Sequence, residues 1–308
     1  MKILVTGGAG FIGSHVADAF LAEGHDVCIA DDLSSGTRDN VPAGARFYEV
    51  DVRSPELEEV FRREQPEAVS HQAALANVRE SFDDPLRYAE VNVLGSLRLL
   101  EYCRAYEVGK VIYACTGGAS YGEPDSLPVT EEHPVNPLDP YGASKHHVEH
   151  YLFLYSRSFG VRYTSLRYPN VYGERQSPHG EAGVVAIFAR KMLDGEAPLV
   201  NGNGQQERDF VHVSDVARAN VLALRKGDDQ ILNIGTGVGT SVNDIVQELR
   251  HATGFSAAIH NGPSKQGEVY KISLDGTRAG EVLGWTPQVS LRDGIAATVE
   301  HLRDRQAA

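Results

Sequence analysis

The sequence predicts an α/β fold in which a doubly wound parallel sheet is joined to a smaller C-terminal α+β lobe. Strand-like and helix-like segments alternate through the first half of the chain, as they do when helices cover both faces of a parallel sheet. A glycine-rich turn joins the first strand to the first helix, and a length of 308 residues suggests roughly two domains. We expect residues 1–168, with a return segment at about 208–240, to form the sheet domain. Residues 169–308 should form the second lobe, interleaved with the first.

The first unit of the chain is a strand, a glycine-rich turn and a helix. The apolar run KILVT leads into GGAGFIGS, and HVADAFLAEG follows with apolar positions at helical spacing. A second strand, DVCIAD, completes a βαβ unit typical of a Rossmann-type dinucleotide site. In such a unit Gly7 permits the tight turn, Gly10 lets the backbone approach a diphosphate, and Gly13 allows close packing of helix on strand. The alternative is that these glycines only shape a turn.

The acidic residue that ends the second strand indicates which dinucleotide binds. Asp31 would accept hydrogen bonds from the adenine-ribose diol, and its charge would repel a 2′-phosphate. The residues that follow, DLSSG, include no arginine to receive such a phosphate. The sequence therefore favours NAD over NADP. We interpret Asp32 as a solvated loop carboxylate.

Strands and helices continue to alternate as far as residue 115. Strand-like segments at 45–52, 67–74 and 110–115 are separated by helix-like segments at 55–65 and 85–106. Ligands of parallel sheets bind at the carboxyl ends of strands, where Asp51, the HQAA segment and the loop after residue 115 fall.

That last loop belongs to the stretch VIYACTGGASYG at 111–122 and holds two hydroxyl side chains, Thr116 and Ser120. A hydroxyl in a glycine-rich loop is by itself only a turn former. Farther along, DPYGASK starts an amphipathic helix in which Tyr141 and Lys145 lie one turn apart on the same face. A neighbouring ammonium group lowers the pKa of a phenol, so Tyr141 could act as a general base. Alone, such a pair is also common on solvated helix faces.

Together these motifs resemble a known family. TGGAGFIG, Asp31, the TGG loop and YGASK are similar to the extended short-chain dehydrogenases/reductases, and the whole chain resembles their UDP-glucose (UDP-galactose) 4-epimerase group. RYPNVYGERQSPHGEAGVVAIF at 167–188 is similar to the family's hinge into the substrate domain. RDFVHVSDVARA at 208–219 is similar to its return to the cofactor domain.

The resemblance implies roles for the residues already singled out. Tyr141 would be the acid/base, Lys145 would lower its pKa and hold the nicotinamide ribose, and Thr116 would support the sugar hydroxyl. Gly117 stands opposite the family's usual catalytic serine, so we expect the adjacent Thr116 to substitute, while Ser120 points elsewhere. The implied cofactor-binding residues are Gly7, Gly10, Phe11, Ile12, Gly13, Asp31, Asp51, Val52, Ala73, Ala74, Tyr141, Lys145 and Tyr168.

The implied substrate is a nucleotide sugar, most simply UDP-galactose or UDP-glucose. Tyr141 would take the proton of the 4-hydroxyl while C4 gives hydride to NAD, and the 4-keto sugar would turn over before both return. The implied substrate-binding residues are Thr116, Tyr141, Asn170, Val184, Asn201, Arg208, Lys265 and Glu268.

Several departures from the family pattern leave the substrate open. Lys265 replaces an arginine, Ala76 replaces a lysine near the diphosphate, and Asn201 replaces an aromatic that packs on uracil. In the family, a bulky side chain at the position of Ile272 excludes N-acetylated sugars and a small one admits them. Ile272 is of intermediate size, so it does not indicate which sugars bind. A UDP-N-acetylhexosamine, UDP-uronic acid or UDP-pentose is therefore an alternative substrate. A non-catalytic NAD(H) sensor is an alternative function, although such relatives usually lose the tyrosine or the lysine.

Composition indicates which binding partners the protein lacks and in which cellular compartment it works. A net charge of −13 argues against nucleic acid. No apolar run approaches the ~20 residues that span a bilayer, and the start of the chain lacks the apolar core of a signal peptide. Three widely spaced cysteines argue against disulfides and zinc and for the cytoplasm; no metal is expected. The resemblance implies a homodimer formed by helices near 85–106 and 141–159.

Overall fold

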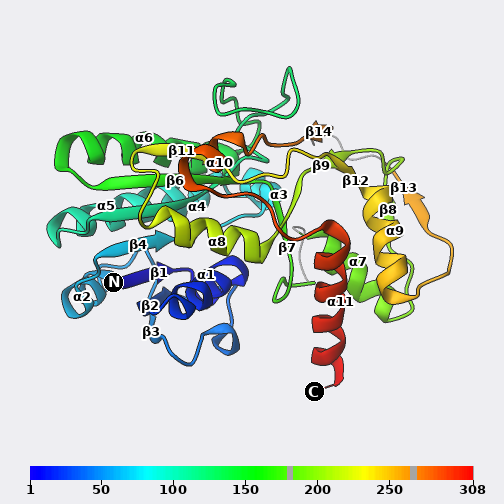
Figure 1. The fold of residues 1–308 in the computed structure, drawn as a ribbon, viewed down its shortest axis with the longest axis horizontal. Helices are drawn as coiled ribbons and strands as arrows, with labels where there is room; N and C mark the ends of the chain where they lie inside the picture. Colours follow the sequence, from blue (N-terminus) through cyan, green and yellow to red (C-terminus); the bar gives the residue numbers. More distant parts are fainter. Residues whose placement is uncertain (179–182, 264–268, 308) are drawn as a thin grey trace.

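A seven-stranded sheet forms the centre of the protein, with the strand order β11-β6-β5-β4-β1-β2-β3 and every neighbouring pair parallel (Figure 1). This computed structural model describes residues 1–178, 183–263 and 269–307. The order reverses between β1 and β4, which opens a crevice at the carboxyl ends of the strands. The strands are β1 Lys2–Thr6, β2 Asp26–Asp31, β3 Arg46–Glu49, β4 Ala68–His71, β5 Lys110–Thr116, β6 Arg162–Tyr168 and β11 Gln230–Asn233.

Helices cover both faces of this sheet because successive strand residues point to opposite sides. Ile3 and Val5 of β1 pack with one layer of helices, and Leu4 between them packs with the other. The first layer contains α1 Phe11–Ala22, α8 Val213–Ala223 and α10 Thr277–Leu283. The second contains α2 Leu57–Glu64, α5 Gly95–Ala105 and α6 Pro140–Phe159. The structure thus confirms the α/β, Rossmann-type fold expected from the alternation of segments.

The helix expected at 85–106 is a chain of short pieces. It consists of α4 Pro85–Tyr88, a π-helical segment η2 Ala89–Leu94, and α5, and α3 Val78–Asp83 precedes it. Asp84 caps α4 by accepting a hydrogen bond from the Arg87 amide, 3.1 Å away. All of these pieces pack against α6.

The C-terminal part forms a smaller lobe beside the sheet domain (Figure 1). Its core is made by α7 Val184–Leu193, α9 Val242–Thr253 and α11 Leu291–Ala307. The helix α11 was expected to end at about Arg303 with a frayed terminus, but it extends to Ala307. The short strands pair as β7 Asn170–Tyr172 with β10 Phe210–His212, β8 Leu199–Asn201 with β13 His260–Gly262, and β9 Glu207–Arg208 with β12 Thr240–Ser241 and β14 Lys271–Ile272.

The chain crosses between the two parts several times. The return segment supplies α8 and β11 to the sheet domain, and α10 later packs against both of them. The division into 1–168 with 208–240, and 169–308, stays a prediction. A 3₁₀ turn, η1 Arg38–Asn40, follows β2 in the sheet domain.

Among the helices in the described ranges, none has both the length and the apolar character needed to cross a membrane.

Candidate active site

A cavity of about 360 Å³ opens at the carboxyl ends of β1, β2, β4 and β5. It lies at the point where the strand order reverses, as expected for a doubly wound sheet. Every residue expected to bind the cofactor lines it: Gly7, Gly10, Phe11, Ile12, Gly13, Asp31, Asp51, Val52, Ala73, Ala74, Tyr141, Lys145 and Tyr168.

The glycine turn has no room for side chains at two of its three key positions. Gly7 has φ +68°, and a Cβ there would lie 2.6 Å from the Ala73 nitrogen. A Cβ on Gly13 would lie 2.1 Å from the Gly7 carbonyl oxygen, so Gly13 is required by packing. At Gly10 a Cβ would meet only that same oxygen, at 3.2 Å, and would otherwise project into open space. Gly10 is also the N-cap of α1 and has no side chain to cap it, which leaves the helix N-terminus available to an anion.

Asp31 is held rigidly at the far end of the cavity. Its Oδ2 accepts a hydrogen bond from the Ala9 amide at 2.9 Å, and its Oδ1 accepts one from the Leu33 amide at 2.8 Å. Burial raises the pKa of Asp31, and these two amide bonds oppose that effect. The two fixed oxygens are suited to accept hydrogen bonds from a diol.

Tyr141 and Lys145 reach the other end of the cavity from the first turns of α6. Asp139 fixes the start of this helix, since its Oδ1 accepts a hydrogen bond from the Gly142 amide at 2.7 Å. Lys145 is only 3% exposed, and its Nζ lies 4.3 Å from the centroid of the Tyr113 ring. Burial lowers the pKa of Lys145 to about 8. Burial raises the pKa of Tyr141, and a side-chain hydrogen bond with Thr116 acts in the opposite direction.

The two candidate hydroxyls, at the end of β5 and in the loop after it, have different surroundings. Thr116 ends β5 and bonds to Tyr141, and its Oγ1 also accepts a hydrogen bond from the Ala119 amide at 3.2 Å. Ser120 is fully buried, with its Oγ 4.0 Å from the sulfur of Cys115. Among the described contacts, Thr116 interacts with Tyr141, whereas the hydroxyl of Ser120 lies beside Cys115. A Cβ on Gly117 would lie 2.3 Å from Cδ1 of the fully buried Leu274, so a side chain there would require this leucine to shift.

Apart from Tyr141, which lines this cavity, the described residues expected around the substrate lie outside its lining. Asn170 is exposed on β7, and its Oδ1 lies 3.8 Å from the position that a Cβ on Gly118 would take. Arg208 on β9 donates from Nη1 to the carbonyls of Glu207 and Tyr270, at 2.9 and 3.2 Å. Val184 starts α7 and Asn201 ends β8. Lys265 and Glu268 fall outside the described residues.

Several lining residues were not singled out by the sequence. Arg53 lines the cavity and binds Asp51 through both carboxylate oxygens, at 2.6 to 3.1 Å. Asp32, interpreted as a solvated carboxylate, is exposed and lies at the same end. Only tertiary structure brings Arg87 and Val91 to the site, from the helix beyond Asp84. The remaining lining residues are Ala30, Ser34, Ser35, Val50, Gln72, Leu75, Ala76, Ala114 and Cys115.

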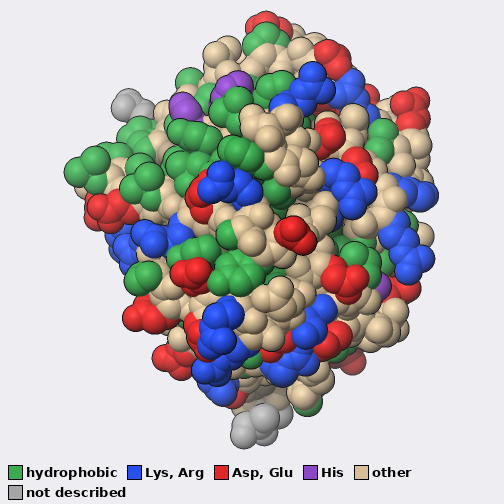
Figure 2. Space-filling model, turned by 90° about the vertical axis from the view of Figure 1, so that its left-hand side faces the viewer, with side chains coloured by type: hydrophobic (Ala, Val, Ile, Leu, Met, Phe, Trp, Pro, Cys, Tyr) green, Lys and Arg blue, Asp and Glu red, His purple; other side chains and the backbone are tan. Residues whose placement is uncertain are grey.

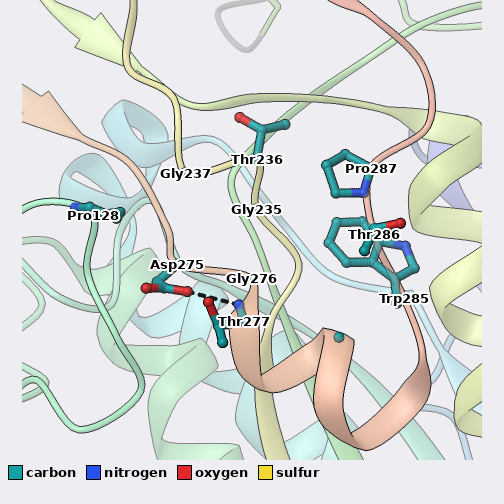
Figure 3. Close-up of a pocket in the computed structure, with 11 residues that line it drawn as sticks. Pro128, Gly235, Thr236, Gly237, Asp275, Gly276, Thr277, Trp285, Thr286 and Pro287 are labelled. Atoms are coloured by element: carbon teal, nitrogen blue, oxygen red, sulfur yellow. Dashed lines mark hydrogen bonds between the residues drawn. The ribbon is translucent and has the colours of Figure 1, made fainter.

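A second pocket, of about 390 Å³, lies between the loop after β11 and the start of α10 (Figure 3). Its walls are mainly glycine backbone, threonines and the ring of Trp285, and none of the expected site residues that the structure describes lines it. Its one carboxylate, Asp275, accepts a hydrogen bond from the Thr277 amide at 2.8 Å. This pocket lacks converging polar groups, so the site for chemistry is the cavity that holds Tyr141 and Lys145.

Comparisons with known proteins agree with this geometry. Residues 3–235 match the NAD dependent epimerase/dehydratase family. The UDP-glucose 4-epimerase of Mycolicibacterium smegmatis is 42% identical over 311 residues, which are 99% of this chain and 99% of that protein. The crystal structure of the Thermotoga maritima UDP-glucose 4-epimerase with UDP-glucose has a TM-score of 0.98 at 48% identity, covering 99% of this chain and 100% of that one. The Thermus thermophilus UDP-glucose 4-epimerase in complex with NAD has a TM-score of 0.94 at 45% identity, covering 98% and 99%. The chain therefore belongs to the NAD dependent epimerase/dehydratase family.

Proposed function

We propose that this protein is an NAD-dependent 4-epimerase that interconverts UDP-glucose and UDP-galactose. The proposal rests on one observation: the glycine turn, the fixed carboxylate of Asp31 and the Tyr141–Lys145 pair all line the same cavity. The relatives and solved structures at 42% to 48% identity, named UDP-glucose 4-epimerase, support the same activity.

The residues of the cavity fit NAD. The turn leaves open space at Gly10, next to the uncapped N-terminus of α1, where a diphosphate would accept amide hydrogen bonds. Asp31 would hold the adenine ribose and would repel a 2′-phosphate. Arg53 lies at this end as well, but Asp51 already binds it, so it offers no free cation for such a phosphate. NAD bound here supplies a reversible hydride acceptor for C4 of the sugar.

Proton transfer at the sugar 4-oxygen is assigned to Tyr141. In the protein alone, burial holds the phenol neutral, so its ionisation needs positive charge nearby. Lys145 supplies one such charge and the oxidised cofactor another. Tyr141 would remove the proton of the 4-hydroxyl while C4 gives up hydride, which leaves a 4-keto sugar. After this sugar turns over, hydride would return to the opposite face of C4 and Tyr141 would return the proton to the 4-oxygen. Thr116 would bind the same sugar oxygen, because its hydroxyl already contacts Tyr141.

The nucleotide is assigned to the C-terminal lobe. Arg208 and Asn170 would contact the diphosphate region, while Val184 and Asn201 would lie along the nucleotide. Asn170 supports this placement because its side chain lies near Gly118 and Thr116. Lys265 and Glu268 complete the proposed set on the basis of the family resemblance.

The test is proton NMR of the purified protein with UDP-galactose, without added cofactor. We expect UDP-glucose to appear with no net NADH, because the cofactor is regenerated in each cycle. Parallel samples with UDP-N-acetylgalactosamine, a UDP-uronic acid and a UDP-pentose measure which other sugars are converted. Ile272, the residue expected to separate N-acetylated from plain sugars, is buried against Tyr121, Val129 and Leu274. No conversion of any of these sugars after NAD is added would contradict the proposal and would favour a sensor role.

We further propose a homodimer formed through α3–α6. Large apolar side chains on these packed helices face solvent, including Leu86 at 75% and Phe82 at 60% exposure. Single exposed apolar residues are ordinary, but a group on adjoining helices is typical of an interaction surface. Figure 2 views the side on which α5 and α6 lie, and hydrophobic side chains gather on part of that face. The other members are Val78, Leu94, Phe153, Leu154 and Phe159.

Light scattering after gel filtration tests the dimer at micromolar concentration. Leu86→Asp should shift the protein toward monomer by burying a charge in the interface. Val238→Asp changes a side chain of similar exposure, 61%, far along the chain and should leave the mass unchanged. A wild-type monomer would contradict the proposal.

The cytoplasm is the proposed location, supported by three cysteines that are all free and buried.

A further inference from the structure

A buried ion pair lies behind the catalytic end of α6. Glu149, one turn after Lys145, accepts two hydrogen bonds from Arg167 on β6, from Nε at 3.0 Å and from Nη2 at 2.7 Å. Each residue is only 3% exposed. Ser165 donates a third hydrogen bond to the carboxylate at 2.8 Å, and His146 Nδ1 lies 3.1 Å from it. Burial disfavours the carboxylate, but these partners outweigh it and hold the pKa of Glu149 well below its usual range.

Arg167 also reaches the loop that follows Thr116. Its Nη1 donates to the hydroxyl of Tyr121 at 2.8 Å, and that hydroxyl donates to Asn233 on β11 at 2.7 Å. The pair is therefore fixed by α6, β6, β11 and the loop after β5. A carboxylate held from so many sides cannot turn away from Lys145 to solvent.

The electrostatic surroundings of Lys145 explain why this carboxylate matters. The titratable groups that face Lys145 in the described chain are Cys115 and Tyr113 of β5, His71 of β4, and Tyr141 and Glu149 of α6. Burial raises the pKa of the Cys115 thiol to about 12 and raises the pKa of the Tyr113 phenol well above its usual value, so both are neutral at pH 7. Burial and the charge of Lys145 lower the pKa of His71 to about 3, so it is neutral too. Within this described set, Glu149 is the negative charge at neutral pH.

We propose that Glu149 is a positioning residue that keeps Lys145 protonated in the working enzyme, and that Arg167 keeps Glu149 ionised and in place. The inference rests on the proposed function, in which the charge of Lys145 favours the phenolate of Tyr141. A buried lysine loses its proton readily, and a nearby carboxylate opposes that loss. Glu149 therefore extends the pH range of activity upward without touching the substrate.

The test is the pH dependence of kcat for the NAD-loaded protein, which reports groups that titrate in the substrate complex. The charged form of Lys145 is present below its pKa, so activity should fall as pH rises through that value. Glu149→Gln removes the supporting charge, and we expect the alkaline limb to move to lower pH by about one unit. Ser165→Ala is the matched control: it removes a hydrogen bond from the same carboxylate but keeps its charge, so the limb should stay in place.

A second variant covers the case in which an unpaired Arg167 prevents folding. Glu149→Leu/Arg167→Met replaces the pair with apolar side chains, an exchange that buried ion pairs often tolerate. Its alkaline limb should also move to lower pH. A folded variant with reduced kcat but an unmoved limb would overturn the proposal, because a purely structural role predicts that result. Wild-type protein that fails to epimerise any sugar would instead contradict the proposed function.

Discussion

The proposed cofactor side of the site is formed by backbone at the ends of long parallel strands, whereas the proposed substrate side is formed by short strands and helix ends of the C-terminal lobe. On the first side, β1, β4 and β5 lie in one sheet, and their carboxyl ends meet at a single cavity. On the second side, Asn170, Asn201 and Arg208 belong to three separate small sheets. Sheet geometry alone aligns the first group, while the second depends on how loops and lobes pack.

The two sides also differ in what their residues contribute. Gly13 is required because a Cβ would overlap the Gly7 carbonyl, and Asp31 is fixed by two backbone amides. These are constraints of the fold itself. Arg208, in contrast, bonds to two backbone carbonyls and must exchange or share these contacts to bind a diphosphate. Variants on the two sides should therefore change different kinetic quantities.

The largest effect is expected for Tyr141→Phe, at the end of the cofactor cavity. Removing the hydroxyl deletes the group that we propose moves the proton, so kcat should fall by about 10³-fold. NAD should stay bound, since the turn at Gly7–Gly13 and Asp31 are untouched. Conversion followed by NMR and cofactor content after gel filtration measure both. A variant with wild-type turnover would remove Tyr141 from the mechanism.

The next effect compares two hydroxyls of one loop. Thr116→Ala should lower kcat by about 10²-fold, because the side chain that contacts Tyr141 is lost. Ser120→Ala should change kcat by less than about twofold, since Ser120 is fully buried and its hydroxyl lies beside the sulfur of Cys115. Steady-state rates of the two variants decide the assignment. If Ser120→Ala proved the more damaging change, Thr116 would not be the partner of Tyr141.

The same contrast explains how much the sequence could predict. The strand, glycine turn, helix and Asp31 are local in sequence, and local sterics dictate their arrangement, so the cofactor cavity follows from the motif. Arg87 and Val91 escaped prediction because tertiary packing alone brings them to the cavity. Leu274, which fills the space at Gly117, comes from a segment more than a hundred residues away. From sequence, Gly117 could be compared only with the family's usual serine, and no sequence pattern showed that Leu274 packs there.

The helical segment at 85–105 shows the same limit on a smaller scale. Its apolar spacing predicted one long helix, yet the π-helical turn Ala89–Leu94 interrupts it. Asn92 within that turn donates from Nδ2 to Ser144 Oγ at 2.8 Å, and its Oδ1 accepts a hydrogen bond from the Leu75 amide at 2.8 Å. The turn therefore joins α6 to the loop after β4. Such a hydrogen-bonded change of helical pitch leaves no periodic trace in sequence.

Two glycines of the cofactor turn should separate packing from ligand space. Gly13→Ala should lower the melting temperature of the NAD-free protein by several degrees, because its Cβ would overlap backbone that cannot move. Gly10→Ala should melt close to the wild type but weaken NAD binding by about tenfold or more, since its Cβ enters the space of the diphosphate. Thermal unfolding and titration calorimetry supply the two readouts. Wild-type affinity in Gly10→Ala would show that no diphosphate approaches this position.

The smallest effect is expected on the substrate side, for Arg208→Ala. Losing a charged hydrogen-bond donor to a diphosphate should raise the KM for UDP-galactose by about tenfold. The proposed proton transfer takes place at Tyr141, so kcat should change much less. Lys271→Ala is a suitable control: this exposed cation lies on the neighbouring strand β14 and pairs with Glu207 at 2.6 Å. If both variants raised KM equally, long-range charge and not contact would explain the effect, because a contact acts only through the residue that makes it. If Arg208→Ala lowered kcat and left KM unchanged, Arg208 would act on the cofactor side of the site. The distinction between the two sides would then no longer hold.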